Sequence, residues 1–430
     1  MRKSHHSPMK QRYDSYKPSG IDWIGDIPSH WTVSKLKHHI HIDSGDYISK
    51  DEISDDNKIP VFGGGEQIGF ASKSNVSENT LIIGRVGARC GCVTPIIQRA
   101  WATDNSLICI PKKDFKFLYY LLLAANLNKL NESNAQPLIT STKVKNLIIG
   151  MPPLAEQEAI AAWLDEKCGE IDAAIAKVDR EIELIDELKQ SEISRVVTRG
   201  LNPHVPLRPS GIDWIGDIPK HWAMARIRNI IEQTKNGIKI GPFGSALTGH
   251  VLTGLPYKVY GQWNIVGKDF KAGIGTVSAS IFKNLQAYEV KENDILISMM
   301  GTIGKCSIVP SHICPGIMDS HVVKIRLNTN LYNSRYFEYI YDKDNSNIII
   351  SELSLKKKGS IMDGLNSSII KDLHILVPPL SEQQAIADYL DKKCAEIDGL
   401  RAKLIKKRET LTELRQSIIS EVVTGKRKII

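Results

Sequence analysis

Hydrophobic positions with helical spacing occur in two long stretches of the sequence. Each stretch follows a Pro-Pro-Leu triplet, and the 48-residue segments that begin at Pro152 and Pro378 are identical at 27 positions. From Ile171 the apolar residues alternate in steps of four and three, which is the spacing of a coiled-coil seam. The pattern predicts two helices of about 45 residues that pack antiparallel against each other. The apolar stripes are Ile160, Leu164, Ile171, Ile175, Val178, Ile182 and Ile185, and then Ile386, Leu390, Ile397, Leu404, Leu411, Leu414 and Val422.

The second stripe departs from the first at two positions. Arg401 stands where the first copy has Ile175, and Arg408 stands where it has Ile182. An imperfect seam of this kind suits a partner helix that is similar to it but not identical.

A shorter segment is also duplicated, and each copy precedes one of two domains. Residues Lys17–Trp31 and Arg208–Trp222 share thirteen of their fifteen positions. The order along the chain is therefore short segment, domain, long helix and linker, and then the same elements again. This order predicts a tandem duplication with four parts: residues 1–151, the first long helix at 152–200, a linker and second domain at 201–377, and the second long helix at 378–430.

The two domains between the repeated segments have similar hydrophobic patterns. Apolar runs broken by glycine predict equivalent hairpins at Thr80–Val93 and Asp294–Val309, each followed by a polar triplet beginning at Asp104 or Asp319. Helical spacing then covers 116–130 in the first domain and 334–342 in the second. We expect two pseudo-symmetric α/β domains of one fold with different surface loops, joined by two long antiparallel coiled-coil helices.

Composition is that of a soluble protein of 430 residues, with 42% hydrophobic and 24% charged positions. No apolar run approaches the roughly 20 residues of a membrane span, and no apolar signal core follows the basic N-terminus. The seven cysteines contain no Cys-x-x-Cys pair. These features predict a cytoplasmic protein with reduced thiols.

The positive charge is concentrated outside the predicted long helices. The whole chain carries +8, residues 156–199 carry −6 and residues 382–425 are neutral, so the remainder carries +14. This distribution indicates that a polyanion binds the domains and leaves the helices for protein contacts.

The two "PSGIDWIGDIP-HW" segments, the two "PPL-EQ-AIA--LD-KC-EID" helices and the two dissimilar domains resemble the specificity subunit of type I restriction–modification enzymes. The resemblance covers essentially the whole chain. It implies that each domain is a target recognition domain that reads one half of a bipartite, asymmetric DNA site. It also implies that two methyltransferase (modification) subunits dock on the repeats and that restriction subunits, which are ATP-dependent endonucleases, join the complex. In that family the specificity subunit itself has no catalytic role.

The sequence contains no catalytic or cofactor motif that would contradict this resemblance. The chain has no Gly-x-x-x-x-Gly-Lys-Ser/Thr loop and no Asp/Asn-Pro-Pro-aromatic motif, and its histidine and cysteine spacings do not match a structural zinc site. We therefore expect no catalytic residue, no cofactor and no metal. Two other interpretations remain open at this point: a stand-alone DNA-binding or scaffold protein, and an enzyme with an unfamiliar active site.

Candidate DNA contacts are polar and basic residues in the glycine-rich loops and hairpins, because base edges and phosphates are bound by such side chains. They are Gln67, Lys73, Asn75, Arg85 and Arg89 in the first domain, and Lys235, Asn236, Lys239, Gln262, Asn264, Lys305, Lys356 and Lys357 in the second. Four tryptophans of the short repeats, Trp23, Trp31, Trp214 and Trp222, either anchor these segments to their own domain or dock a partner subunit.

Overall fold

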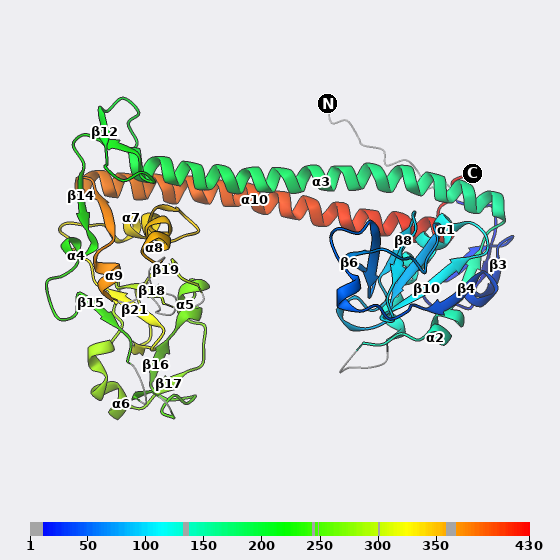
Figure 1. Ribbon diagram of the computed structural model, residues 1–430, viewed down its shortest axis with the longest axis horizontal. Coiled ribbons are helices and arrows are strands. Elements are labelled where there is room, and N and C mark those ends of the chain that lie inside the picture. The colour runs from blue at the N-terminus through cyan, green and yellow to red at the C-terminus, as the bar shows by residue number, and fades with distance from the viewer. Residues whose placement is uncertain (1–11, 132–136, 243–245, 248, 300–301, 358–366) are drawn as a thin grey trace. The chain divides into compact units, whose positions relative to one another are not determined.

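The computed structural model describes residues 12–131, 137–242, 246–247, 249–299, 302–357 and 367–430. The chain divides into two compact units. Unit 1 comprises Met1–Asp179 and Ile405–Ile430, and unit 2 comprises Arg180–Leu404. Each unit contains one α/β domain and parts of both long helices, α3 (Leu154–Arg199) and α10 (Leu380–Val423) (Figure 1).

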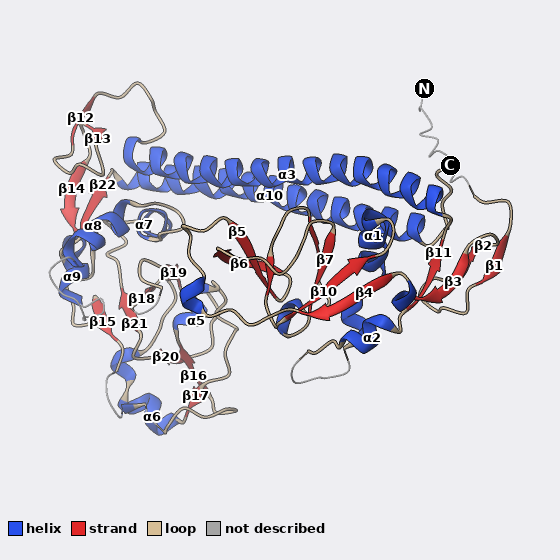
Figure 2. Cartoon of the chain, turned by 45° about the vertical axis from the view of Figure 1, so that its right-hand side comes forward, coloured by secondary structure: helices blue, strands red, loops and turns tan. Residues whose placement is uncertain are grey.

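The domain of unit 1 is built on a four-stranded antiparallel sheet and a three-stranded mixed sheet (Figure 2). The four-stranded sheet has the order β4-β10-β7-β8, and the three-stranded sheet has the order β6-β5-β9, in which β5 and β9 are parallel. Two further strand pairs lie outside these sheets. β1 pairs with β2, and β3, which precedes the sheets in the chain, pairs with β11, which follows them. The strands are β1 (Tyr16–Pro18), β2 (Asp26–Pro28), β3 (Thr32–Lys35), β4 (Ile40–Ser44), β5 (Ile59–Gly63), β6 (Glu66–Ala71), β7 (Thr80–Gly84), β8 (Val93–Ile96), β9 (Trp101–Ala102), β10 (Ser106–Pro111) and β11 (Ile148–Met151).

The domain of unit 2 has the same strand order. Its four-stranded sheet is β15-β21-β18-β19, its three-stranded sheet is β17-β16-β20 with β16 and β20 parallel, and its separate pairs are β12-β13 and β14-β22. The strands are β12 (Leu207–Pro209), β13 (Asp217–Pro219), β14 (Ala223–Arg226), β15 (Ile238–Ile240), β16 (Tyr257–Tyr260), β17 (Thr276–Val277), β18 (Ile295–Ser298), β19 (Cys306–Ile308), β20 (Gly316–Met318), β21 (Val322–Ile325) and β22 (His374–Val377). The predicted fold class is confirmed, and the predicted hairpins are β7-β8 and β18-β19.

Short helices complete the domains. The predicted helical segment of the first domain is α1 (Phe115–Ala125), which begins where the Asp114 carboxylate accepts a hydrogen bond from the Phe117 N–H. Its counterpart is α7 (Ser334–Tyr341), which Asn333 caps in the same way. The other short α-helices are α2 (Ser141–Lys145), α4 (Ile227–Ile230), α5 (Gln262–Val266), α6 (Ala279–Asn284), α8 (Ile348–Lys357) and α9 (Ser367–Lys371), and the 3-10 turns are Leu36–His38, Lys50–Glu52, Gly87–Arg89, Leu127–Leu130 and Gln286–Tyr288.

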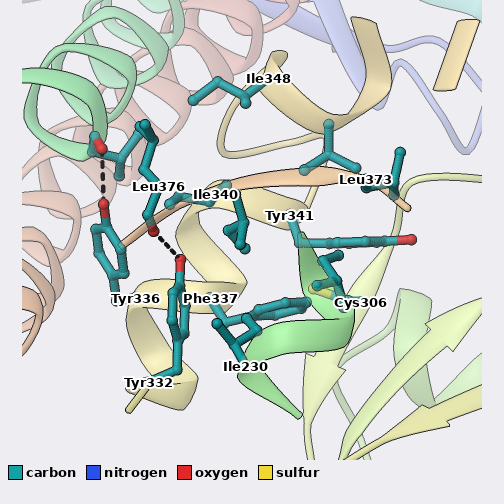
Figure 3. Close-up of a cluster of buried hydrophobic side chains, with 14 of the residues drawn as sticks. Ile230, Cys306, Tyr332, Tyr336, Phe337, Ile340, Tyr341, Ile348, Leu373 and Leu376 are labelled. Carbon is teal, nitrogen blue, oxygen red and sulfur yellow. Dashed lines mark hydrogen bonds between the residues drawn. The ribbon is translucent and has the colours of Figure 1, made fainter. Parts of the chain in front are cut away.

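Helix α7 anchors its domain to the rest of unit 2 through buried tyrosines (Figure 3). The Tyr332 hydroxyl, just before the helix, donates to the main-chain oxygen of Leu376 on β22 at 2.8 Å. The Tyr336 hydroxyl donates to the oxygen of Val197 on α3 at 2.9 Å. Both rings are fully buried, so their polar ends need these partners, and the two bonds fix the domain core against β22 and the end of α3.

Candidate nucleic-acid interface and the clasps that support it

The two duplicated segments bind each other in unit 1. Trp31, at the end of the short repeat, is fully buried, and its Nε1 donates to the Glu156 carboxylate at 3.1 Å. The His30 Nε2 lies 2.8 Å from the other carboxylate oxygen, and the Tyr13 hydroxyl donates to the same group. Glu156 belongs to the first turn of α3 and is itself buried. We call this arrangement the first clasp.

Unit 2 contains a second clasp built from the same residue types. The Trp222 Nε1 donates to Glu382 at 3.0 Å, and the His221 Nε2 lies 2.7 Å from the other oxygen of that carboxylate. In this clasp no tyrosine hydroxyl takes part among the described residues, and the Glu382 side chain is 40% exposed, against 7% for Glu156. The duplication of both the His-Trp pair and the Glu residue is therefore explained by their mutual binding.

The glutamines that follow these glutamates have equivalent contacts as well. The Gln157 Nε2 donates to the main-chain oxygen of Pro152 at 2.8 Å, and the Gln383 Nε2 donates to that of Pro378 at 2.8 Å. These bonds satisfy carbonyl groups in the Pro-Pro turn that precedes each long helix. The "PPL-EQ" motif is thus a local structural unit that starts the helix and presents the glutamate to the clasp.

The C-terminal end of each long helix closes on a clasp tryptophan of its own unit. Gly200, after α3, and Gly425, after α10, both have a φ of +74°, the left-handed conformation that commonly ends a helix. A Cβ atom on Gly200 would lie 3.2 Å from the Trp222 ring, and one on Gly425 would lie 2.3 Å from the Pro28 Cδ and 3.3 Å from the Trp31 ring. Glycine is needed at both sites for the conformation and for the close approach.

The burial of Trp31 and Trp222 favours the anchoring interpretation for these two residues, because neither indole is accessible to a partner. The other two tryptophans differ. Trp214 is 37% exposed, and Trp23 is partly buried with an Nε1 that has no hydrogen-bond partner in the described part of the chain. A docking role therefore stays a prediction for Trp23 and Trp214.

The pairing of α3 with α10 is antiparallel in each unit and is marked by a ladder of ion pairs. In unit 1 the Arg415 Nε lies 2.8 Å from Asp172, and the Arg408 Nε lies 2.6 Å from Asp179. In unit 2 the Arg401 Nε lies 2.8 Å from Asp186. The three aspartates are seven residues apart on α3, and the three arginines are seven residues apart on α10.

The ladder explains why the seam of the second helix is interrupted. Arg401 and Arg408, which replace isoleucines of the first copy, face acids that only α3 carries. Each exposed pair contributes at most about 1 kcal/mol, so the ladder defines register and partner more than it adds stability. Asp172, Asp179 and Asp186 were not singled out from the sequence, although their heptad spacing opposite the arginines was a signal that could have found them.

The candidate DNA contacts of the first domain fall into two groups. Gln67 on β6 and Arg89 in the β7-β8 turn are exposed, and Arg85 in the same turn is partly buried. The Arg89 Nη1 lies 3.5 Å from the Glu66 carboxylate, so the β7-β8 turn contacts the start of β6. A DNA contact by these three residues stays a prediction.

Lys73 and Asn75 have structural partners instead. Lys73 pairs with Glu52, lowering the pKa of that carboxyl to about 2, and its Nζ lies 4.7 Å from the centre of the Trp101 ring. The Asn75 amide donates to Asp46 and to the Ala102 oxygen at 2.9 Å each, and accepts from the Ala102 N–H at 2.7 Å. The hydrogen-bonding groups of Asn75 hold its own loop together, and a DNA contact by this residue stays a prediction.

Two candidates of the second domain also have partners within the fold. Asn264 is 2% exposed, and its amide bonds to the main chain of Gly261, Asp269 and Ala272. The Lys305 side chain is 13% exposed and pairs with Asp344, with Asp342 at 3.9 Å. Burial lowers the pKa of Lys305. DNA contacts by Asn264 and Lys305 stay predictions.

The other candidates of the second domain are more accessible. Lys235 and Asn236 are exposed, and Lys239 is partly buried with its Nζ 5.7 Å from the centre of the Tyr288 ring. Gln262 begins α5, where its Nε2 donates to the His321 oxygen at 3.4 Å. Lys356 and Lys357 lie at the end of α8, but their side chains are outside the described part of the structure.

Residues 28–183 and 238–407 match the family model described as "Type I restriction modification DNA specificity domain". The chain belongs to this family. It is 24% identical over 445 residues to the "Putative type I restriction enzyme MjaX specificity subunit" of Methanocaldococcus jannaschii, which covers 94% of this chain and 96% of that protein. It is 21% identical over 365 residues to the "Type I restriction enzyme MjaVIII specificity subunit" of the same organism, covering 82% and 80%.

One solved structure supports the fold of this specificity-domain protein. A chain described under "Structural basis underlying complex assembly and conformational transition of the type I R-M system" has a TM-score of 0.66 at 13% identity, covering 92% of this chain and 98% of that one. At this identity the likeness concerns the fold alone. The family itself concerns DNA specificity in type I restriction–modification systems, so the coarse function of the chain is recognition of DNA sequence.

The sequence predicts that metal-binding and membrane-spanning features are absent. No group of three or more His, Cys, Asp or Glu side chains in the described residues is arranged to hold a metal ion. Among the helices formed by the same residues, none combines the length and apolar character needed to cross a membrane.

Proposed function

We propose that the chain is a non-catalytic specificity subunit that reads a bipartite, asymmetric DNA site and directs methylation and cleavage by the partner subunits of a type I restriction–modification complex. The observation that carries the proposal is that two domains of identical strand order carry different loops on nearly identical clasps. Similar frameworks offer equivalent positions to two copies of one partner, whereas different loops contact different base sequences.

The proposed partners are double-stranded DNA, two methyltransferase subunits on the duplicated segments, and restriction subunits that join through the complex. The domain limits at 151/152, 200/201 and 377/378 are part of the same proposal. Arg85, Arg89 and Gln67 contact DNA in the first domain, and Lys235, Asn236, Lys239 and Gln262 do so in the second.

Replacing residues 32–151 by the equivalent domain of a relative is expected to change one half of the methylated sequence and to leave the other half unchanged. The exchanged segment excludes Trp31 and Glu156, so the first clasp stays intact. Sequencing of methylated DNA from cells that contain the chain and its methyltransferase measures the result. Arg85→Ala and Arg89→Ala are expected to weaken or relax the same half-site. A change in both halves would contradict the assignment of one reader to each half, and a wild-type chain that produces no methylated motif would contradict the proposed function itself.

Binding of the purified chain to a duplex without a target site is expected to weaken steeply with salt, because contacts to phosphates release counterions. With about six such contacts, affinity should fall on the order of a thousandfold between 50 and 200 mM salt. Fluorescence anisotropy over this range gives the slope of log affinity against log salt. Lys235→Ala should reduce the slope by about one, and Lys177→Ala, an exposed change on α3, should leave it unchanged. A flat plot for the wild type would contradict the electrostatic mode of binding.

A further inference from the structure

The two domains share a position at which a pair of parallel strands ends side by side. In the first domain the Thr103 N–H, just after β9, donates to the oxygen of Phe62 on β5 at 2.9 Å. In the second domain the Asp319 N–H, just after β20, donates to the oxygen of Tyr260 on β16 at 2.9 Å. These bonds make 103–105 equivalent to 319–321, and the segment after β5 equivalent to the segment after β16. We call each of these places the strand-end junction.

In the first domain the junction borders a cavity of about 560 Å³. Tyr47, Ile53 and Ile68 form apolar parts of its lining, and Tyr47 and Ile68 are 74% and 51% exposed. Thr103, which also lines it, is 5% exposed, and its Oγ1 has no hydrogen-bond partner among the described residues. A buried hydroxyl without a partner in the chain is uncommon in a folded protein, and its hydrogen bond is open to a water molecule or to a ligand.

Asp104 and Asn105 occupy the exposed part of the same cavity lining. Within the part of the chain that the structure describes, the Asp104 carboxylate and the Asn105 amide make no side-chain hydrogen bond, in contrast to Asn75. The main-chain oxygen of Asn105 accepts from the Arg85 N–H at 3.0 Å, so the junction adjoins the turn that contains Arg85 and Arg89. Free polar groups beside basic residues are the combination that contacts base edges and phosphates together.

The junction of the second domain presents a different set of exposed groups. Trp263, in the segment after β16, is 84% exposed, and the His321 side chain is 52% exposed. The bond from the Gln262 amide to the His321 oxygen connects the two sides of this junction. Lys239 lies on β15, which pairs with β21, the strand that starts directly after His321. The framework is therefore equivalent, but the chemistry that it presents is not.

We infer that the strand-end junction is the base-reading surface of each domain. Asp104 and Asn105 determine the sequence read by the first domain, and His321 and Gln262 determine the sequence read by the second. An Asn or Gln amide matches the N6 and N7 groups of adenine, a carboxylate accepts from the N4 of cytosine, and exposed apolar groups such as Tyr47, Ile68 and Trp263 suit the thymine methyl group. This inference rests on the proposed function and adds the residues that set its specificity.

The test uses the full chain with its methyltransferase and sequencing of methylated DNA. Asn105→Ala is expected to relax one base position in one half-site, with on the order of a ten- to hundredfold loss of discrimination between matched and mismatched sites. Asp104→Ala should act in the same half-site, and His321→Ala should act in the other. The matched controls are Glu78→Ala in the first domain and His250→Ala in the second, both at exposed positions away from the junctions, and they should leave the motif unchanged.

A second variant guards against loss of folding. Asn105→Asp has nearly the same shape but replaces a donor by an acceptor, so it should shift the preferred base without changing the melting temperature. If the wild type methylates a bipartite motif and the junction variants leave it unchanged, the inference is overturned and the proposed function stands. Both Asn105 variants could also keep the wild-type melting temperature and lose methylation completely. That result would overturn the inference that Asn105 reads a single base position. If the wild type yields no methylated motif, both the inference and the proposed function are contradicted.

Discussion

Glu156→Ala is expected to destabilise the protein by about 3 kcal/mol, whereas Glu382→Ala should cost about 1 kcal/mol. Glu156 is buried and accepts from Trp31 and Tyr13, which are buried, and from His30, which is exposed, so its removal leaves two buried donors without a partner. The Glu382 side chain is 40% exposed, and water can replace it at His221 and Trp222. The two glutamates occupy the same position in the duplicated motif, so the pair is a matched comparison of buried and exposed clasps.

Hydrogen exchange measured by mass spectrometry can follow each clasp separately, which a single melting curve of a protein with two units cannot do. In Glu156→Ala, protection should fall in peptides covering 13–31 and the start of α3. In Glu382→Ala, a smaller loss should occur in peptides covering 207–222. Glu156→Gln keeps an acceptor oxygen and should lie between wild type and Glu156→Ala. Equal losses in the two alanine variants would show that burial of the carboxylate does not govern the strength of the clasp.

The long helices and the equivalent hairpins of the two domains could be predicted because their signals are periodic and occur twice. The four-three spacing from Ile171 identified the seam, and the glycine-broken runs identified the hairpins that became β7-β8 and β18-β19. The residues of the clasps were visible in the sequence, since the His-Trp pair and the Glu residue are duplicated together. What the sequence lacked was any indication that these two motifs, about 125 residues apart, contact each other rather than a partner.

The individual DNA contacts were harder to predict, because residue type does not reveal whether a polar side chain is already paired. Asn75 and Asn105 are the same residue type in neighbouring loops of one domain, yet the first bonds to Asp46 and Ala102. Asp342 and Asp344, which pair with Lys305, follow it in the sequence by almost forty residues. Only the fold brings these partners together, so sequence reasoning could propose polar loop residues but could not separate amides and lysines that are already paired from free ones.

Equal heptad insertions in the two long helices are expected to change the spacer between the two half-sites of the proposed DNA target. Both α3 and α10 contribute to each unit, so equal insertions in both helices lengthen the connection between the two readers. The ladder identifies the insertion points. One heptad is placed directly after Asp179 and one directly before Arg408, so that this pair and the pairs on either side keep their partners. Copies of residues 173–179 and 408–414 preserve the apolar stripes and add one further Asp–Arg pair.

Each insertion adds about 10.5 Å of helix, which corresponds to about 3 base pairs of B-DNA. Because 3 base pairs also rotate the second half-site by about a third of a turn, the variant should either prefer a longer spacer or lose activity until the twist of the DNA compensates. Methylation of a series of duplexes that differ only in spacer length measures the optimum. A variant with the insertion in α3 alone is the control. It shifts the pairing of α3 with α10 by seven residues on one side of the insertion, so the variant should lose stability. An unchanged optimum with undiminished methylation in the double insertion would show that the helices do not set the distance between the half-sites.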